Sequence, residues 1–155
     1  MTSTVAVTRG EHRLYYAGAD GHHSSIRHNK ISVATLRPDG FAGWRRVHAN
    51  ASDPNGGSSR LTTRAVNIAG SSLSITLDVS ANAGGELWVG LLDAASGMPL
   101  PGFHIGDCVP LVATGTDVLM HWKASADLSD LVGRAVLVEM SLRGVGVMIY
   151  SYTFG

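Results

Sequence analysis

Three histidines and an aspartate share one polar, glycine-containing stretch near the start of the chain: Asp20, His22, His23 and His28. Imidazole and carboxylate groups are ligands that divalent transition metals accept. The spacing of these four residues matches no compact metal motif, and histidines are common in loops. We therefore interpret the stretch as an ordinary loop and predict no transition-metal site there.

Cys108 is the single cysteine, which excludes an intrachain disulfide and a zinc cluster built on thiolates. A catalytic cysteine needs a lowered pKa and a base beside it. The neighbouring sequence supplies no base apart from His104, so we predict a buried structural thiol. The chain also lacks Gly-x-Ser-x-Gly, the nucleophile motif of many esterases.

Carboxylates are the groups that glycoside hydrolysis uses, as a pair about 5–10 Å apart in an open cleft. Glu86 and Glu139 fall at polar positions of predicted strands. The aspartates fall at predicted turns, where the side chain bonds to the local backbone. They are Asp93, Asp107, Asp117, Asp127 and Asp130. Because no pair stands out, we predict that this chain is not an enzyme.

Two tryptophan positions are candidates for ligand binding. Trp44 stands beside Arg45 and Arg46, and Trp88 stands in an otherwise alternating apolar run. A flat aromatic ring with guanidinium groups nearby suits the apolar face and the hydroxyls of a sugar. We predict a ligand-binding set of Trp44, Arg45, Arg46 and Trp88, with packing or an interface as the alternative for Trp44.

Calcium is the one cofactor for which the sequence offers ligands. Asp53 and Asn55, with Asn50 before them, lie in a glycine-rich stretch whose side-chain oxygens suit Ca²⁺. The D-x-[DN]-x-[DN]-G pattern is missing, so this expectation rests on composition alone. We predict no other cofactor.

Composition narrows the class of protein. Among 155 residues, 12 are Lys or Arg and 12 are Asp or Glu, so the formal net charge is zero. A nucleic-acid binder or a polybasic membrane-surface protein needs an excess of positive charge. The sequence has no apolar run of about 18 residues and no visible signal peptide. These features predict a soluble protein, cytoplasmic on the sequence alone.

Alternation of apolar and polar residues predicts strands from residue 60 onward. The run 72–80 directs Leu73, Ile75, Leu77 and Val79 inward and its serines and threonine toward water. The run 86–91 directs Leu87, Val89 and Leu91 inward, and we expect these two runs to form a hairpin. Further strands are predicted at 118–123, 136–142 and 147–154, with one helical turn or tight loop at 127–133. Short strands with glycine between them predict an all-β fold, an antiparallel β-sandwich of jelly-roll or concanavalin A-like type.

The N-terminal part of the sequence is predicted to form a structural segment separate from the sandwich. Residues 1–11 are expected to form an arm or a short edge strand, and 13–18 and 29–36 a long-looped hairpin. We place the division between residues 1–45 and 46–155. A two-stranded hairpin is marginal alone, and its open edges and apolar side chains favour association with a partner. The interface candidates are Leu14, Tyr15, Tyr16, Ile31 and Val33.

A succession of short motifs gives the chain a family resemblance. The motifs include Leu14-Tyr15-Tyr16, the run 31–41, the runs 84–89, 98–103 and 107–111, and Tyr150-Ser151-Tyr152-Thr153-Phe154. From about Arg13 to Gly155 the chain resembles the C-terminal end of glycoside hydrolase family 32/43-like proteins. Within residues 1–45, the arm and hairpin resemble the final strands of a propeller blade. In those proteins a five-bladed β-propeller of the invertase/arabinanase kind precedes a jelly-roll-like sandwich.

The resemblance implies an ancestry among carbohydrate-active proteins but no catalysis. The catalytic carboxylates of such families sit in earlier propeller blades, which this sequence does not contain, and residues 44–59 look like an insertion. The family resemblance also implies an extracellular location. We expect a non-catalytic accessory module that works through protein packing or self-association. A carbohydrate-binding, lectin-like module and a glycosidase fragment are the alternatives.

Overall fold

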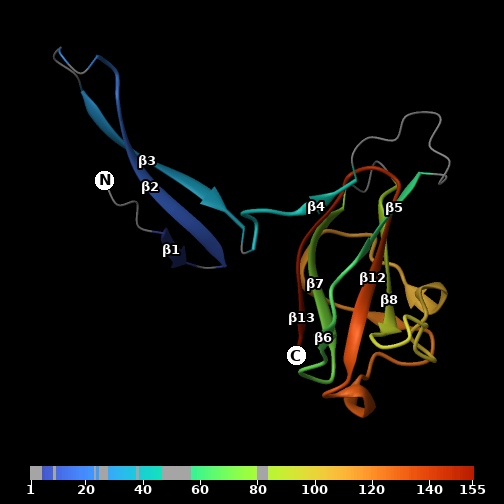
Figure 1. The fold of residues 1–155 in the computed structure, drawn as a ribbon. Coiled ribbons are helices and arrows are strands. Elements are labelled where there is room, and N and C mark those ends of the chain that lie inside the picture. The colour runs from blue at the N-terminus through green and yellow to red at the C-terminus, as the bar shows by residue number, and fades with distance from the viewer. Residues whose placement is uncertain are drawn as a thin grey trace. The chain divides into compact units, whose positions relative to one another are not determined.

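The fold is known from a computed structural model, which describes residues 5–8, 10–22, 24, 28–37, 39–46, 57–79 and 84–155. Throughout those residues the chain is built from antiparallel strands with two short 3-10 helices and no α-helix (Figure 1). The prediction of an all-β antiparallel fold is therefore confirmed. None of the described helices has the length and apolar character that a membrane span requires.

The chain divides into two compact units, unit 1 (residues 1–41) and unit 2 (residues 42–155). The division predicted from the sequence lies after residue 45. Strand β4 (Trp44–Arg45) accounts for the difference, because it pairs with the last strand of unit 2, with Arg45 opposite Met148 and Trp44 opposite Ile149. Trp44 and Arg45 are thus part of the larger unit.

Unit 1 is a three-stranded sheet in the order β1-β2-β3. Its strands are β1 (Val5–Thr8), β2 (Glu11–Ala19) and β3 (Asn29–Leu36). The register of β2 and β3 runs from His12 opposite Leu36 to Ala19 opposite Asn29. β1 pairs with the other edge of β2, so the second of the two expectations for residues 1–11, a short edge strand, matches the structure. Gly10 permits the tight turn before β2 with its φ of 77°.

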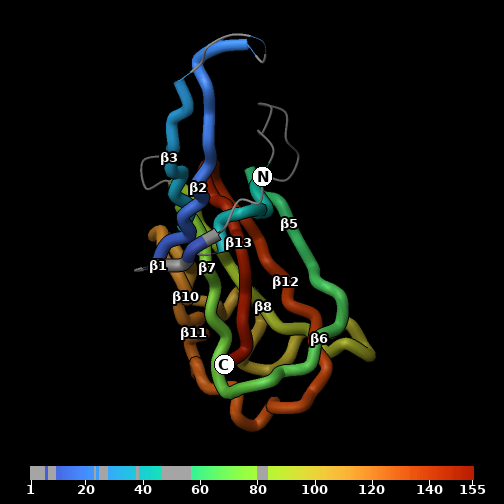
Figure 2. The backbone as a smooth tube through the Cα atoms, turned by 90° about the vertical axis from the view of Figure 1, so that its left-hand side faces the viewer, coloured from blue at the N-terminus to red at the C-terminus, as the bar shows by residue number. Residues whose placement is uncertain are grey.

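Unit 2 contains two four-stranded sheets, shown in two views in Figures 1 and 2. The first has the order β10-β7-β13-β4. In the second, β12 lies in the middle, with β8 on one side and β5 and β6 on the other. The bounds of the strands not yet given are β5 (Ser58–Thr62), β6 (Val66–Asn67), β7 (Leu73–Val79), β8 (Glu86–Asp93), β10 (Gly115–Leu119), β12 (Ala135–Arg143) and β13 (Val147–Phe154).

Short elements complete unit 2. A two-stranded pair joins β9 (Cys108–Val109) to β11 (His121–Trp122). The 3-10 helices are η2 (Ile105–Asp107) and η3 (Ser129–Leu131). The helical turn expected within 127–133 is thus confirmed, whereas the single strand expected at 118–123 is two strands separated by the buried Met120.

The hairpin expected from β7 and β8 is wrong. β7 lies between β10 and β13, and β8 pairs with β12 from Asp93 opposite Val136 to Glu86 opposite Arg143. The two strands therefore belong to different sheets. Alternation fixes which side chains of a strand face the core but carries no information about the strand's neighbour.

One hydrophobic core receives side chains from both sheets of unit 2. The inward positions predicted in β7 and β8 are all buried: Leu73, Ile75, Leu77, Val79, Leu87, Val89 and Leu91. Trp122 is buried as well, and its indole N–H donates to the carbonyl of Val89 at 3.0 Å. The preceding residue, His121, is exposed.

Thr76 corrects the expectation that the polar face of β7 meets water. Its side chain is fully buried, and its hydroxyl accepts a hydrogen bond from the backbone N–H of Asp117 at 3.1 Å. The register of β10 against β7 shifts between Gly115 and Val118. This bulge places extra backbone over Thr76 and gives the buried hydroxyl a partner.

Candidate functional site

A groove of about 580 Å³ opens in unit 2 where β5 of one sheet approaches β4 and β13 of the other. Apolar and aromatic side chains form most of its wall, with hydroxyl groups and one guanidinium between them. The lining residues are Trp44, Leu61, Thr62, Thr63, Arg64, Met140, Ile149, Tyr150, Ser151 and Tyr152. Among the predicted ligand-binding residues, only Trp44 lines this groove.

Strand register explains why the groove is apolar. Opposite residues of an antiparallel pair lie on the same face of a sheet. Trp44 is opposite the buried Ile149, and Leu61 is opposite the buried Met140. The side chains of Trp44 and Leu61 therefore lie on the core-facing sides of their sheets and continue the apolar core into the groove. Trp44 is not covered by other residues of unit 2, since 64% of it is exposed.

Hydrogen-bonding groups without a partner in the described part of the chain border this apolar surface. They are the indole N–H of Trp44, the hydroxyl of Tyr152 and the guanidinium of Arg64. Thr63 differs, because its hydroxyl donates to the carbonyl of Arg64 and accepts from the N–H of Val138. The groove thus presents apolar surface and hydrogen-bond donors together, which is the character of a binding surface.

Arg45 and Arg46 lie elsewhere. They line a smaller hollow of about 260 Å³ with residues 145–148. The Arg46 guanidinium donates to the carbonyls of Gly57 and Gly144, so it holds two backbone segments together. Arg45 follows Trp44 in β4, and successive side chains of a strand point to opposite faces. The structure therefore separates Trp44 from the two arginines that the sequence grouped with it.

Trp88 is engaged by its own neighbours. Its indole N–H donates to the Glu86 carboxylate at 2.7 Å, and the Arg143 guanidinium carbon lies 4.3 Å from the ring centroid. This cation–π contact covers one ring face. Trp88 does not line the groove that contains Trp44.

The carboxylates serve local structure. Glu139 is buried and pairs with Arg60 at 2.9 Å.

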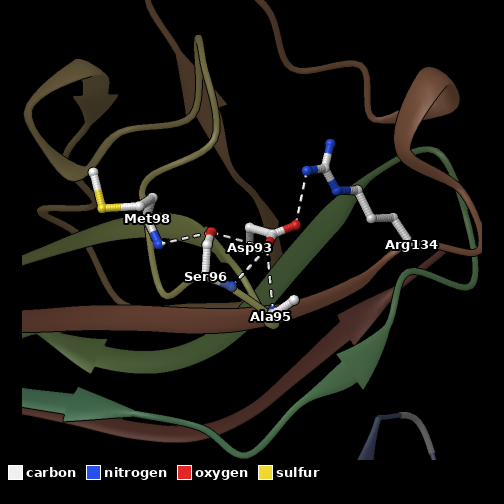
Figure 3. Close-up of polar contacts among 5 residues, drawn as sticks. All are labelled: Asp93, Ala95, Ser96, Met98 and Arg134. Atoms are coloured by element: carbon white, nitrogen blue, oxygen red, sulfur yellow. Dashed lines mark hydrogen bonds and ion pairs between the residues drawn. The ribbon is translucent and has the colours of Figure 1, made fainter.

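Asp93, at the end of β8, accepts hydrogen bonds from Ser96 and the N–H of Ala95 and pairs with Arg134 at 2.8 Å (Figure 3). The Arg134 guanidinium and then the Ser96 donors hold the pKa of Asp93 well below its ordinary value. Asp127 accepts in the same way from Ser129. The predicted role of these two aspartates in turns is confirmed.

Cys108 is buried, as predicted, and burial raises the pKa of its thiol. The Sγ atom lies 3.2 Å from the backbone N of Val89. His104 is occupied separately, because its Nδ1 accepts from the N–H of Gly106 at 3.0 Å and caps η2.

Asp20 and His28 of the N-terminal histidine group form an exposed pair in the structure. Asp20 accepts from the N–H of His28 at 2.8 Å, and its other oxygen lies 3.2 Å from Nδ1 of His28. These contacts lower the pKa of Asp20. Within the ranges that the structure describes, no three His, Cys, Asp or Glu residues are grouped to hold a metal ion. His23 and the calcium candidates Asp53, Asn55 and Asn50 lie outside those ranges.

The interface candidates divide between the two faces of the unit 1 sheet. Tyr15 is opposite Val33, and Ile31 is opposite Ala17, so the three larger side chains form a stripe on one face. Ile31 is 83% exposed, and Tyr15 and Val33 are about half exposed. Leu14 and Tyr16 lie on the other face, with Leu14 partly buried and Tyr16 exposed. We call Tyr15, Ile31 and Val33 the apolar stripe.

Comparisons of the chain with protein-family models, with curated proteins and with solved structures gave no match. The family resemblance read from the sequence motifs therefore stays a prediction.

Sequence reasoning did not find most residues of the groove. Leu61 and Arg64 follow a glycine-rich stretch, whereas Tyr152 is near the C-terminus, and no local pattern connects them. The one usable signal was the alternation of Tyr152 and Phe154, which places both rings on the inward face of the last strand.

Proposed function

We propose that the chain is a non-catalytic accessory module. In this proposal unit 2 is an antiparallel β-sandwich of jelly-roll-like type, and unit 1 packs against another protein surface. The observation that carries the proposal is that none of the described side chains of unit 1 is buried. All fully buried residues within the described ranges belong to unit 2.

A sheet without a buried core lacks the main source of folding stability. The apolar stripe leaves Tyr15, Ile31 and Val33 in water, although burying a side chain of this size contributes roughly 1.5–3 kcal/mol. A surface that covers the apolar stripe would remove this deficit.

The outer edge of β3 favours a partner made of further β-strands. β3 pairs with β2 on one side, and no described segment pairs with its other side. An exposed edge strand of eight residues that carries Ile31 and Val33 is a template for added strands. The motif resemblance agrees with this, since it equates the segment with strands of a propeller blade. A second copy of the chain and a larger assembly both satisfy the proposal.

Sedimentation velocity over a range of protein concentrations tests this function. We expect association that Val33→Glu abolishes, because a charge in the apolar stripe cannot be buried cheaply. Val112→Glu is the matched control, since Val112 is similarly exposed but belongs to unit 2. A monomer at high concentration whose β2 and β3 amides resist hydrogen exchange would contradict the proposal, because unit 1 would then be stable without a partner.

Carbohydrate binding is a second candidate function, and the groove beside Trp44 favours it. An exposed indole over an apolar groove with hydroxyl groups suits the stacking of a sugar ring. Calorimetric titration with simple and plant-type polysaccharides tests it, with Trp44→Ala as the variant that should lose binding. No heat of binding with any of these ligands would rule this function out.

A further inference from the structure

The groove of unit 2 contains a charge that a neutral sugar would leave unused. Arg64 is exposed and has no ion-pair partner in the described part of the chain. It carries the only charge among the described residues that line the groove. We propose that the groove binds an acidic saccharide, with a sugar ring on Trp44 and a uronic-acid carboxylate on Arg64. This inference rests on the carbohydrate-binding candidate above and names its ligand class.

The aromatic wall supplies the surface for the ring. Trp44 is held in β4 opposite Ile149 and remains largely exposed. Tyr152 is held against Phe154, with the two ring centroids 6.3 Å apart in an edge-on arrangement. Both rings are therefore positioned by the strands before a ligand arrives, which lowers the entropy cost of binding.

The positive charge selects the acid. A guanidinium matches a carboxylate in a planar, two-point hydrogen bond, and such charge-assisted bonds are stronger than neutral ones. Among the described residues, no carboxylate lines the groove to repel an anion or to compete for Arg64. The positive charge of the groove lining therefore complements an anionic ligand.

The remaining polar groups favour a saccharide over a lipid acid. The indole N–H of Trp44 and the hydroxyl of Tyr152 have no partners in the described part of the chain. An alkyl chain in the groove would remove water from these groups without replacing their hydrogen bonds, which is costly. The hydroxyls of a sugar ring replace those bonds.

Calorimetry of the full chain with trigalacturonic acid and with its methyl ester tests the proposal, because the two ligands differ in their carboxylates. At low salt we expect the acid to bind at least about tenfold more tightly than the ester. Arg64→Gln should abolish that difference. Arg45→Gln should retain it, because Arg45 carries the same charge but lies outside the groove.

The outcomes separate this inference from the function on which it rests. Equal affinity for acid and ester, or an acid preference that survives Arg64→Gln, overturns the inference while leaving neutral carbohydrate binding in place. Failure of every saccharide to bind overturns both. Circular dichroism of each variant establishes that lost binding does not reflect lost folding.

Discussion

The assigned core of unit 2 can be tested by truncating one buried leucine, Leu91, and one exposed leucine, Leu119. The Leu91 side chain is completely buried in the core, whereas Leu119, on β10, is 51% exposed. Truncating a buried leucine removes its transfer free energy and leaves a cavity. We expect Leu91→Ala to lower the free energy of unfolding by about 2–5 kcal/mol in urea titrations. Leu119→Ala is the control, and a similar loss in both variants would contradict the assigned core.

Cys108 permits a test of burial by reactivity, because it is the only thiol in the chain. Burial raises the pKa of the thiol and shields the sulfur from reagents. We expect an aromatic disulfide reagent at pH 8 to react at least about tenfold more slowly with the native chain than with the chain in urea. Equally fast reaction in both would show that Cys108 is accessible.

At the scale of elements, the turn after β8 depends on one ionised carboxylate. Asp93 receives the Arg134 guanidinium and the donors of Ser96 and Ala95, which together connect the turn to the segment before β12 (Figure 3). These contacts lower the pKa of Asp93 below its ordinary value of 3.8. The ionised form therefore stabilises the fold at every pH above about 4.

That stabilisation should disappear as the pH falls through the pKa of Asp93 in the folded chain. We expect Asp93→Asn to lower the free energy of unfolding at pH 7 and to lose less stability than the parent between about pH 5 and pH 3. Urea titrations at pH 7, pH 5 and pH 3 measure the free energy of unfolding of the variant and of the parent. Asp130→Asn is the control, since Asp130 has no hydrogen-bond partner in the described part of the chain. An unchanged pH dependence in Asp93→Asn would contradict the role of this ion pair.

The strands show which features of the fold can be predicted from local sequence patterns and which cannot. Alternation in β7 and β8 identified every inward side chain correctly, because the pattern is a property of one strand. The pairing of those strands was predicted wrongly, since the partner of β8 is β12, far along the chain. The burial of Thr76 was missed for the same reason, because it depends on a bulge in β10.

The groove was only partly predictable for a related reason. Trp44 was identified from its type and its neighbours, but its grouping with Arg45 and Arg46 ignored that β4 sends successive side chains to opposite faces. Arg64 and Tyr152 join Trp44 only through the approach of β5 to β13, which is a non-local arrangement. The local part of the site was therefore predictable and the assembled part was not.

At the scale of the whole molecule, the two units differ in what stabilises them. Unit 2 has a continuous core from two sheets, whereas the described side chains of unit 1 are all at least partly exposed. The three tryptophans, Trp44, Trp88 and Trp122, all belong to unit 2. Tryptophan fluorescence therefore reports on unit 2 alone, while circular dichroism reports on the strands of both units.

This separation predicts two unfolding transitions in dilute solution, where no partner covers unit 1. The dichroism signal should begin to change at a lower urea concentration than the fluorescence, because a sheet without a buried core unfolds first. Leu91→Ala should shift the fluorescence midpoint downward. Val33→Ser, a change in the apolar stripe, should leave that midpoint in place. Coincident transitions, or a fluorescence midpoint that falls with Val33→Ser, would show instead that the two units fold as one cooperative body.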